Sequence, residues 1–306
     1  TAQCIAVFFG RVSGMIILGH DQSGSNPPSL IEAVRTWRGQ LPAGESLALV
    51  PTMGALHEGH LSLVRAAREE CDQVALTIFV NPTQFAPGED LSEYPRTLKK
   101  DLEKAREVGV DLVWLGQAEL LYPPGFSTEV FVPELSERLC GLSRPHHFGG
   151  VCIVVLKLFN IFQPTHAYFG EKDLQQVTII ERMTQDLNLP LKIVSCPLVR
   201  EPDGLAMSSR NVRLSDEERV TALSLSAVLG QIVSSHAAGE MNVEKLLKDA
   251  RSLLPAEVSL EYLEILDRSS LQPLQDLSES PDAVTCLAAR VGEVRLIDNM
   301  ALVHPR

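Results

Sequence analysis

Apolar residues along the first two thirds of the chain fall into two kinds of run. Apolar runs such as 47–50, and 110–115 with Asp111 as its one polar residue, are typical of strands that are buried on both faces of a sheet. Between them, spacings of three and four residues, as at Leu61, Val64 and Ala67, place apolar side chains on one face of a helix. We therefore predict strands at 47–50, 74–80, 110–115, 166–169 and 191–196, and helices from Ser29, from about His60, and at 98–108, 151–162 and 174–187.

The order of these elements indicates how they are arranged. A regular alternation of strand, helix and strand is typical of a parallel sheet with helices on both faces. The first helix is expected to begin at a capping box formed by Ser29 and Glu32. We predict a Rossmann-like α/β domain over residues 1–198, of which residues 1–28 form an unassigned extension.

The pattern changes after about residue 198. Ser215 and Glu218 have the spacing of a capping box, so a long helix is expected to begin there and to run to about His236. A second helix is expected at 243–254, and alternating apolar positions are typical of strands at 259–266, 283–289 and 294–297. Helices followed by strands indicate a smaller α+β domain over residues 199–306, which we interpret as a lid.

Composition narrows the class of protein. Of the 306 residues, 45% are hydrophobic and 22% are charged, and the net charge of −12 argues against a nucleic-acid or anionic-membrane partner. No apolar run approaches the roughly 20 residues of a membrane-spanning helix. The spacing of the 6 cysteines fits neither a metal site nor a disulfide framework. We predict a cytoplasmic protein with small buried thiols, which binds neither nucleic acid nor a membrane.

The segment from Pro51 to His60, Pro-Thr-Met-Gly-Ala-Leu-His-Glu-Gly-His, carries the clearest chemical signal. It lies between a predicted buried strand and a predicted helix, where backbone N–H groups and the helix dipole attract phosphate. His57 can share one face of that helix with His60, while Gly54 and Gly59 allow the backbone to approach a ligand closely. A lone histidine here would more often cap the helix. A zinc site is a second alternative, although no third ligand stands at a suggestive spacing.

This His-x-Gly-His pattern resembles the HxGH nucleotidyltransferase superfamily, which includes class I aminoacyl-tRNA synthetases and several adenylyl- and cytidylyltransferases. The resemblance implies histidines that contact phosphate, because such groups can donate to the charge that develops on a phosphate during transfer. The motif alone implies nucleotidyl transfer and does not name the second substrate.

Further motifs narrow the resemblance. They are Asn81-Pro-Thr-Gln-Phe, Tyr94-Pro-Arg-Thr, Arg144-Pro-His-His-Phe, Phe169-Gly-Glu-Lys-Asp, and Asp203-Gly-Leu-Ala-Met-Ser-Ser-Arg-Asn. Together with Met-Gly-Ala-Leu-His-Glu-Gly-His, and in this order, they resemble the pantothenate synthetase family of pantoate–β-alanine ligases. The resemblance runs from about residue 29 to the C-terminus.

The family resemblance implies an ATP-dependent ligase that works in two steps. An oxygen of pantoate attacks the α-phosphorus of ATP, which gives pantoyl adenylate and pyrophosphate. The amine of β-alanine then attacks the acyl carbon and releases AMP. Both steps rely on positioning and charge stabilisation, so no protein nucleophile is expected, and Mg²⁺ is expected to bridge the phosphates.

The resemblance also implies roles for individual residues. His57, His60 and Lys172 are expected to be catalytic, with His60 the more direct participant. The residues expected to bind ATP are His57, His60, Lys172, Met53, Gly54, Gly59, Gly170, Asp173, Val199, Met207, Ser208, Ser209 and Arg210. Those expected to bind substrate are Gln84, Gln176, Asn81 and Arg144. Gln84 and Gln176 are expected to bind pantoate, and Gln84 is also a candidate for β-alanine. Arg144 is expected either to help bind phosphate or to hold the loop near it. Asp101 is a candidate water-mediated Mg²⁺ ligand, and a plain helix-surface aspartate is the alternative.

The family implies a homodimer, and other interpretations stay open beside it. Residues 295–302, Arg-Leu-Ile-Asp-Asn-Met-Ala-Leu, resemble the cyanobacterial branch, in which a cytidylate kinase domain often follows. No Gly-x-x-x-x-Gly-Lys-[Ser/Thr] loop is present, so the chain is expected to carry no P-loop kinase, although it can be part of a longer protein. The nearest rival is a nucleotidyltransferase that keeps the nucleotide in its product. An inactive nucleotide-binding module is a second rival, against which the intact HxGH motif and Lys172 argue.

Overall fold

The computed structural model describes residues 8–12, 14–19, 28–86 and 88–302. The chain forms two compact units. Unit 1 comprises residues 1–136, 144–170 and 179–196, and unit 2 comprises residues 137–143, 171–178 and 197–306. Most of the predicted extension over residues 1–28 lies outside the described residues.

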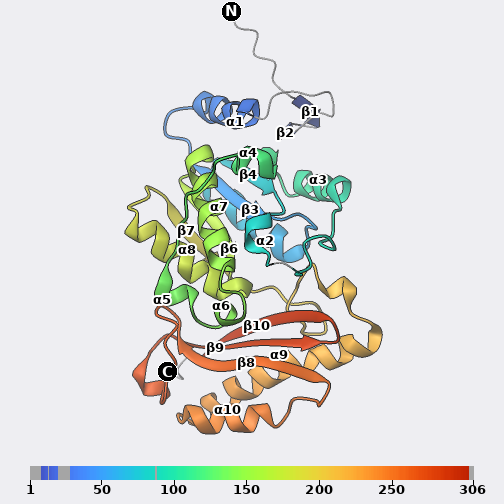
Figure 1. The fold of residues 1–306 in the computed structure, drawn as a ribbon, viewed down its shortest axis with the longest axis vertical. Helices are drawn as coiled ribbons and strands as arrows, with labels where there is room; N and C mark the ends of the chain where they lie inside the picture. The colour runs from blue at the N-terminus through green and yellow to red at the C-terminus, as the bar shows by residue number, and fades with distance from the viewer. Residues whose placement is uncertain (1–7, 13, 20–27, 87, 303–306) are drawn as a thin grey trace, which may run out of the picture. The chain divides into compact units, whose positions relative to one another are not determined.

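Unit 1 is built on a seven-stranded sheet (Figure 1). Its strands are β1 (Phe8–Val12), β2 (Met15–Leu18), β3 (Leu47–Thr52), β4 (Gln73–Ile78), β5 (Leu112–Leu115), β6 (His166–Gly170) and β7 (Lys192–Cys196). Their order is β1-β2-β5-β4-β3-β6-β7. Strand β1 runs antiparallel to β2, and all the other pairings are parallel. The predicted Rossmann-like parallel sheet is therefore confirmed, and β1 and β2 are additions that the apolar pattern did not reveal.

The strand order reverses direction between β3 and β6, which are neighbours in the sheet. From β3 the chain moves outward through β4 and β5, and it later returns to the opposite side of β3 to form β6 and β7. The carboxyl ends of two strands at such a reversal leave a place where open α/β sheets bind ligands. The predicted phosphate-binding segment 53–60 leaves β3 at this end.

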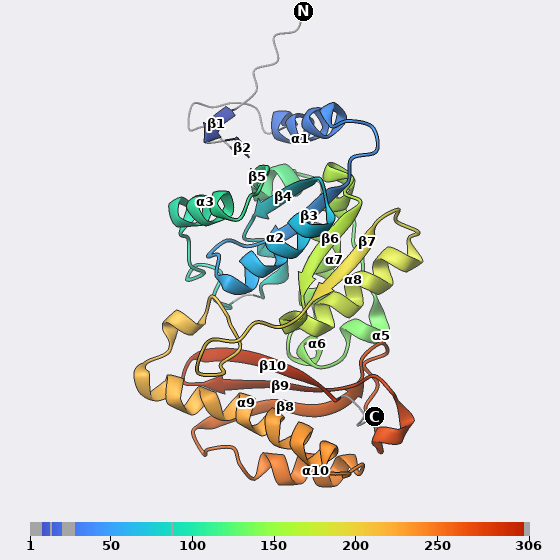
Figure 2. The same cartoon turned by 180° about the vertical axis from the view of Figure 1, so that it is seen from behind.

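Helices pack on both faces of this sheet (Figures 1 and 2). Val50 of β3 and Val113 of β5 join one apolar cluster with residues of helices α2 and α3. The next residue in β5, Trp114, makes an edge-to-face contact with Phe162 of helix α7, on the other face. Successive side chains of a strand point to opposite faces, so strands covered on both faces are apolar at most positions.

The five longer helices of unit 1 agree with the predicted elements except at their ends, and the two short helices α4 and α5 were not predicted. They are α1 (Pro28–Gln40), α2 (Glu58–Glu70), α3 (Leu98–Glu107), α4 (Ala118–Leu121), α5 (Pro133–Ser136), α7 (His147–Phe162) and α8 (Leu174–Asp186), the last of which begins in unit 2. The predicted start of α1 at a Ser29 cap is wrong, because the helix begins at Pro28, and proline suits the first helical position. Helix α7 begins four residues before the predicted Val151.

Unit 2 is built on a three-stranded antiparallel sheet in the order β10-β9-β8. Its elements are α6 (Cys140–Ser143), α9 (Asp216–Ala237), α10 (Val243–Arg251), β8 (Val258–Asp267), β9 (Ala283–Val291) and β10 (Val294–Leu302). Helices α9 and α10 supply Leu225, Leu229 and Leu246 to an apolar cluster with one face of this sheet. A smaller cluster that includes Leu174 and Val284 covers the other face. The predicted α+β arrangement of the C-terminal region is confirmed.

Two sequence-based expectations about apolar residues can be compared with the described residues. The five cysteines among them are buried and free, as predicted. Helix α9 is long and apolar enough to cross a membrane by length and composition, which the search for uninterrupted apolar runs did not predict. Its first turn carries three acidic residues, and its apolar face packs in the core cluster of unit 2.

Helix α9 begins with the predicted capping box. The Ser215 hydroxyl accepts a bond from the Glu218 N–H at 3.2 Å, and the Glu218 carboxylate accepts one from the Ser215 N–H at 2.8 Å. We expect Ser215→Ala to lower the free energy of unfolding by about 1 kcal/mol in urea titrations. The matched control is Ser234→Ala, because the Ser234 hydroxyl only donates to the Gly230 carbonyl inside the same helix. Equal effects of the two substitutions would contradict the capping role.

Candidate functional site

The loop that follows β3 turns through two left-handed backbone conformations. Gly54 has φ +83° and Ala55 has φ +49°. A Cβ at position 54 would lie 3.0 Å from Ile78 and 3.3 Å from the Asp101 carboxylate, so glycine is required for both conformation and space. This turn carries the chain from the central strand into helix α2.

The Asp101 carboxylate of helix α3 holds this turn in place. It accepts bonds from the Ala55 N–H at 3.0 Å, the Leu56 N–H at 2.8 Å and the Thr97 hydroxyl at 3.0 Å. Asp101 is 1% exposed, so the alternative of a helix-surface aspartate is wrong. The hydrogen bonds give Asp101 a role in shaping the loop, and its role as a Mg²⁺ ligand stays a prediction.

His57 and His60 lie together at the start of α2. Their ring centroids are 4.0 Å apart, and the His60 Nδ1 atom accepts a bond from the His57 N–H at 3.3 Å. Gly59 lies against the first ring, because a Cβ at this position would be 3.1 Å from the His57 Nδ1 and Cε1 atoms. The absence of a side chain at Gly59 therefore leaves the space in which His57 is held, at the positive end of the helix dipole.

Asn81 follows β4 and organises the short 3-10 helix η1 (Pro82–Gln84). Its amide donates to the Gly150 carbonyl at 3.0 Å and to the Gln84 side chain at 3.1 Å. Its oxygen accepts bonds from the hydroxyls of Tyr122 and Thr83. Asn81 is 1% exposed, so these contacts support a positioning role rather than direct contact with a substrate.

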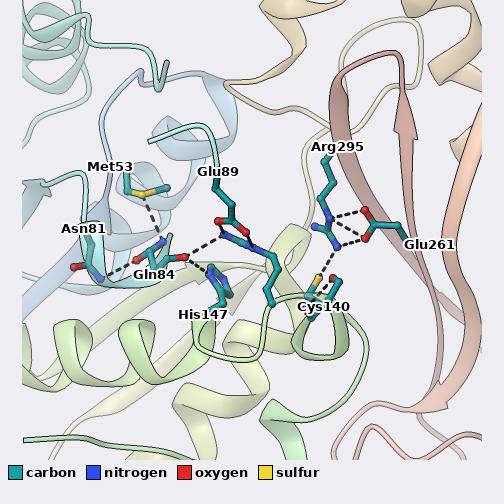
Figure 3. Close-up of polar contacts among 10 residues, drawn as sticks. Met53, Asn81, Gln84, Glu89, Cys140, His147, Glu261 and Arg295 are labelled. Carbon is teal, nitrogen blue, oxygen red and sulfur yellow. Dashed lines mark hydrogen bonds and ion pairs between the residues drawn. The ribbon is translucent and has the colours of Figure 1, made fainter. Parts of the chain in front are cut away.

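Gln84 is held at both its side chain and its backbone (Figure 3). Its side-chain amide donates to the Met53 sulfur at 3.5 Å. Its carbonyl accepts from Arg144 at 3.1 Å and lies 2.8 Å from the His147 Nδ1 atom. The structure thus brings Met53, Asn81, Gln84 and Arg144 into one hydrogen-bonded network.

Arg144 also forms a two-bond ion pair with Glu89, at 2.7 and 2.6 Å. Partial burial opposes ionisation of Glu89, yet the bonds from Arg144 outweigh it and hold the pKa of this carboxyl below its usual range. The Arg144 guanidinium is therefore engaged with Glu89 and with the Gln84 carbonyl. These contacts support the loop-holding role of Arg144 over direct contact with phosphate.

Gly150 sets how closely α7 approaches η1. A Cβ at this position would lie 2.4 Å from the Thr83 carbonyl oxygen and 2.7 Å from the Gln84 nitrogen. Both are backbone atoms, which cannot move aside without shifting η1. The close approach allows the Asn81 amide to reach the Gly150 carbonyl.

In unit 2, Lys172 lies in the 3-10 helix η2 (Glu171–Asp173), directly after β6 ends at Gly170. Its ammonium lies 3.6 Å from the exposed Asp173 carboxylate, and its side chain is 21% exposed. Gln176 follows in the first turn of α8 and is partly exposed. Lys172, Asp173 and Gln176 therefore form one short polar segment.

The remaining predicted ATP residues lie in a closed loop over residues 199–211. The Met207 N–H donates to the Val199 carbonyl at 3.0 Å, and the Arg210 N–H donates to the Ser208 hydroxyl at 3.2 Å. The Asn211 amide closes the loop by donating to the Ala206 carbonyl at 3.0 Å. Residues 207–210 are all partly exposed, as residues that contact a ligand must be.

Sequence reasoning missed the residues that hold the predicted contacts in place. His147 lies beside the Gln84 carbonyl, and the Tyr122 hydroxyl donates to Asn81. The lack of a side chain at Gly150 leaves room for η1. Glu89, which pairs with Arg144, was not singled out from the sequence. A glycine pair inside the strongly apolar helix at 149–150 was the one signal in the sequence that pointed to a close backbone contact.

Within the described ranges, no group of three or more His, Cys, Asp or Glu side chains is placed to hold a metal ion. The predicted zinc alternative for His57 and His60 also finds no third ligand in this part of the chain.

Comparisons with known proteins give a consistent result. The family model for pantoate-beta-alanine ligase matches residues 26–301. A pantothenate synthetase from Heliobacterium modesticaldum is 49% identical over 89% of this chain and 99% of its own length. The crystal structure of pantothenate synthetase from Thermus thermophilus has a TM-score of 0.84 at 44% identity, covering 89% of this chain and 98% of that one. A pantoate-beta-alanine ligase from Francisella tularensis, complexed with beta-gamma ATP and beta-alanine, has a TM-score of 0.76 at 35% identity, covering 94% of this chain and 98% of that one.

The two glycines at the start of α7 allow a matched test of the close approach to η1. We expect Gly150→Ala to lower the free energy of unfolding by about 2 kcal/mol, because the added carbon must displace backbone atoms. Gly149→Ala is the control, since its Cβ would find no neighbour closer than 3.7 Å. It should be neutral or stabilising by up to about 1 kcal/mol, because alanine favours a helix over glycine. Urea unfolding of both variants measures this, and similar losses would show that η1 does not limit the space.

Proposed function

The chain belongs to the pantoate–β-alanine ligase family, and from this premise we propose how its own residues carry out the two-step, ATP-dependent joining of pantoate to β-alanine. The observation that carries the proposal is the place of the 53–60 loop. It leaves the central strand β3 where the strand order reverses, and its backbone is fixed by Asp101. A loop so placed presents helix-terminal N–H groups and two histidines to one ligand.

In the first step a carboxylate oxygen of pantoate bonds to the α-phosphorus of ATP, and the bond to the bridging oxygen of pyrophosphate breaks. Negative charge grows on the phosphate oxygens, and fixed donors that meet it there lower the barrier. We assign this role to His57 and His60, with His60 the more direct, and the neighbouring Met53, Gly54 and Gly59 to backbone contact with ATP. The ring contact, the Gly59 space and the Asp101 bonds support the assignment, because each fixes the histidines before ATP arrives.

Unit 2 supplies the second set of proposed ATP contacts. Lys172 is a compact point charge for phosphate oxygens, with Gly170 and Asp173 on either side of it. Ser208, Ser209 and Arg210 offer hydroxyls and a guanidinium fork, and the adjoining Val199 and Met207 close the loop. We propose that these residues bind phosphate oxygens of ATP and that the C-terminal unit acts as a lid.

Gln84 and Gln176 are proposed to bind the hydroxyl and carboxylate groups of pantoate. A neutral amide can both donate and accept, which suits a polyol acid. The network around Gln84 supports this role, because Asn81, Arg144 and His147 restrict its position. In the second step the amine of β-alanine attacks the acyl carbon, the bond to the AMP oxygen breaks, and the amine loses a proton. Gln84 is also a candidate contact for β-alanine.

Mg²⁺ is proposed to arrive bound to the phosphates of ATP and to neutralise part of their negative charge. Asp101 is the proposed second contact, through water. A homodimer and a cytoplasmic location are further proposals that rest on the family resemblance, and the free, buried cysteines agree with a reducing compartment. Continuation of the natural chain into a cytidylate kinase is proposed on the resemblance of residues 295–302 alone.

Pyrophosphate–ATP exchange tests the proposed function directly. With ATP, Mg²⁺ and pantoate but without β-alanine, we expect exchange, and with β-alanine we expect AMP and pantothenate. His60→Ala should lower the exchange rate by about 100-fold or more, the size of a lost transition-state donor. His146→Ala is the control, because His146 is exposed and lies outside the proposed site. No pantoate-dependent exchange by the unaltered chain, or a nucleotide retained in the product, would refute the proposal.

Asp101→Ala separates the two roles considered for Asp101. It leaves the buried Ala55 and Leu56 N–H groups without their acceptor, so we expect the free energy of unfolding to fall by about 2 kcal/mol. If Asp101 acts by holding the loop, the exchange rate should fall and excess Mg²⁺ should not restore it. A Mg²⁺ titration of the exchange rate measures this. Full recovery at high Mg²⁺ would instead identify Asp101 as a metal ligand.

A further inference from the structure

Residues 298 and 299 of strand β10 have no role in the function proposed above. They lie in the Arg-Leu-Ile-Asp-Asn segment that the sequence comparison singled out, next to each other on a strand that pairs with β9 along its whole length. Asp298 is opposite Leu287 and Asn299 is opposite Cys286 in that pairing. A residue on a paired strand is held more rigidly than one in a loop.

The Asn299 side chain binds the backbone carbonyls of two consecutive residues, Glu171 and Lys172. Its side-chain amide donates to the Glu171 carbonyl at 2.8 Å and to the Lys172 carbonyl at 3.2 Å. The side chain of Glu171 is fixed separately by Arg268 at 2.5 Å. One amide with two N–H groups is thus engaged with the two carbonyls of the segment that carries the proposed phosphate-binding lysine.

Asp298 holds the other proposed phosphate-binding segment. Its carboxylate accepts two bonds from the Arg200 guanidinium, at 2.7 and 2.9 Å, and it is 5% exposed. The same guanidinium donates to the Gly204 carbonyl at 3.1 Å and to the Asn299 carbonyl at 3.3 Å. Arg200 is therefore a bridge from β10 to the turn of the 199–211 loop, which carries Ser208, Ser209 and Arg210.

The Asp298–Arg200 pair is costly to break. Burial raises the pKa of the Asp298 carboxyl above its ordinary value, against the opposing effect of Arg200. Loss of Arg200 would leave a buried carboxylate with no compensating charge, which destabilises strongly. Arg200 is therefore a poor test residue. Asn299 is better, because it is uncharged and only partly buried.

We propose that Asp298 and Asn299 are positioning residues that hold the Lys172 segment and the 199–211 loop on one rigid strand. Lys172 and the residues Ser208, Ser209 and Arg210 thereby keep a fixed spacing. This inference rests on the proposed ATP-binding roles of Lys172 and Arg210. It adds that the position of each segment depends on its contacts with β10 as well as on its own backbone. A displacement of about 1 Å of a catalytic group can cost a large factor in rate, so a strand that fixes two segments together matters for the reaction.

The test replaces Asn299 with alanine, and separately with leucine, which keeps side-chain bulk but has no donor. We expect either change to lower the rate of pantoate-dependent pyrophosphate–ATP exchange, per mole of folded enzyme, by about tenfold, the scale of a lost buried hydrogen bond. The control is Asn160→Ala, because the exposed Asn160 amide only donates to the Leu156 carbonyl of its own helix. Thermal unfolding of each variant measures the folded fraction.

A double-mutant cycle with Lys172→Ala separates positioning from general stabilisation. If Asn299 acts through Lys172, Asn299→Ala should have no further effect on exchange once Lys172 is removed. Independent, additive losses would overturn the proposal, as would an Asn299→Ala or Asn299→Leu enzyme with the unaltered rate. If the unaltered chain itself shows no pantoate-dependent exchange, the proposed function fails first, and the positioning role fails with it.

Discussion

The hydrogen bonds between the Asp101 carboxylate and the loop after β3 are the contact on which the candidate site depends. A chain that leaves a central strand and turns at once into a helix must pass through strained backbone, here the left-handed conformations of Gly54 and Ala55. Two N–H groups in that turn are withdrawn from water and need another hydrogen-bond acceptor. Asp101, which lies 46 residues after Ala55 in the sequence, supplies it. The start of α2, and with it the two histidines, follows from how this turn is held.

The fold could be predicted from the sequence because burial leaves a local trace. Strands covered on both faces are apolar at nearly every position, so 47–50 and 110–115 were identifiable, and Ser215 with Glu218 marked a helix start. The order of strands leaves no such trace, since it depends on which strands pair. Strands β1 and β2 were missed because β1 is interrupted by Gly10 and Arg11, and β2 is an apolar run of only four residues directly after Ser13 and Gly14.

The candidate site was predictable in a different way. The residues proposed to contact ligands stand in motifs, so a resemblance was enough to name His60, Gln84 or Lys172. The residues that hold them, such as Gly150 and Asn299, act through bonds to backbone atoms far along the chain, and nothing local marks those bonds. Asp101 shows the limit most clearly: sequence suggested a surface residue or a metal ligand, and only its contacts show a buried loop anchor.

A common construction follows for both units. In unit 1 the 53–60 loop is held by Asp101 and η1 by Asn81 and Arg144, and in unit 2 the Lys172 segment is held by Asn299. In each case the anchor binds backbone carbonyls or N–H groups, so the histidines, Gln84 and Lys172, which are proposed to meet the ligand, do not themselves have to hold the loop. Such a division lets a loop be fixed without neutralising the charge it presents. An uncharged amide suits the anchor of the Lys172 segment because it can donate to two carbonyls, whereas an ionised carboxylate can only accept.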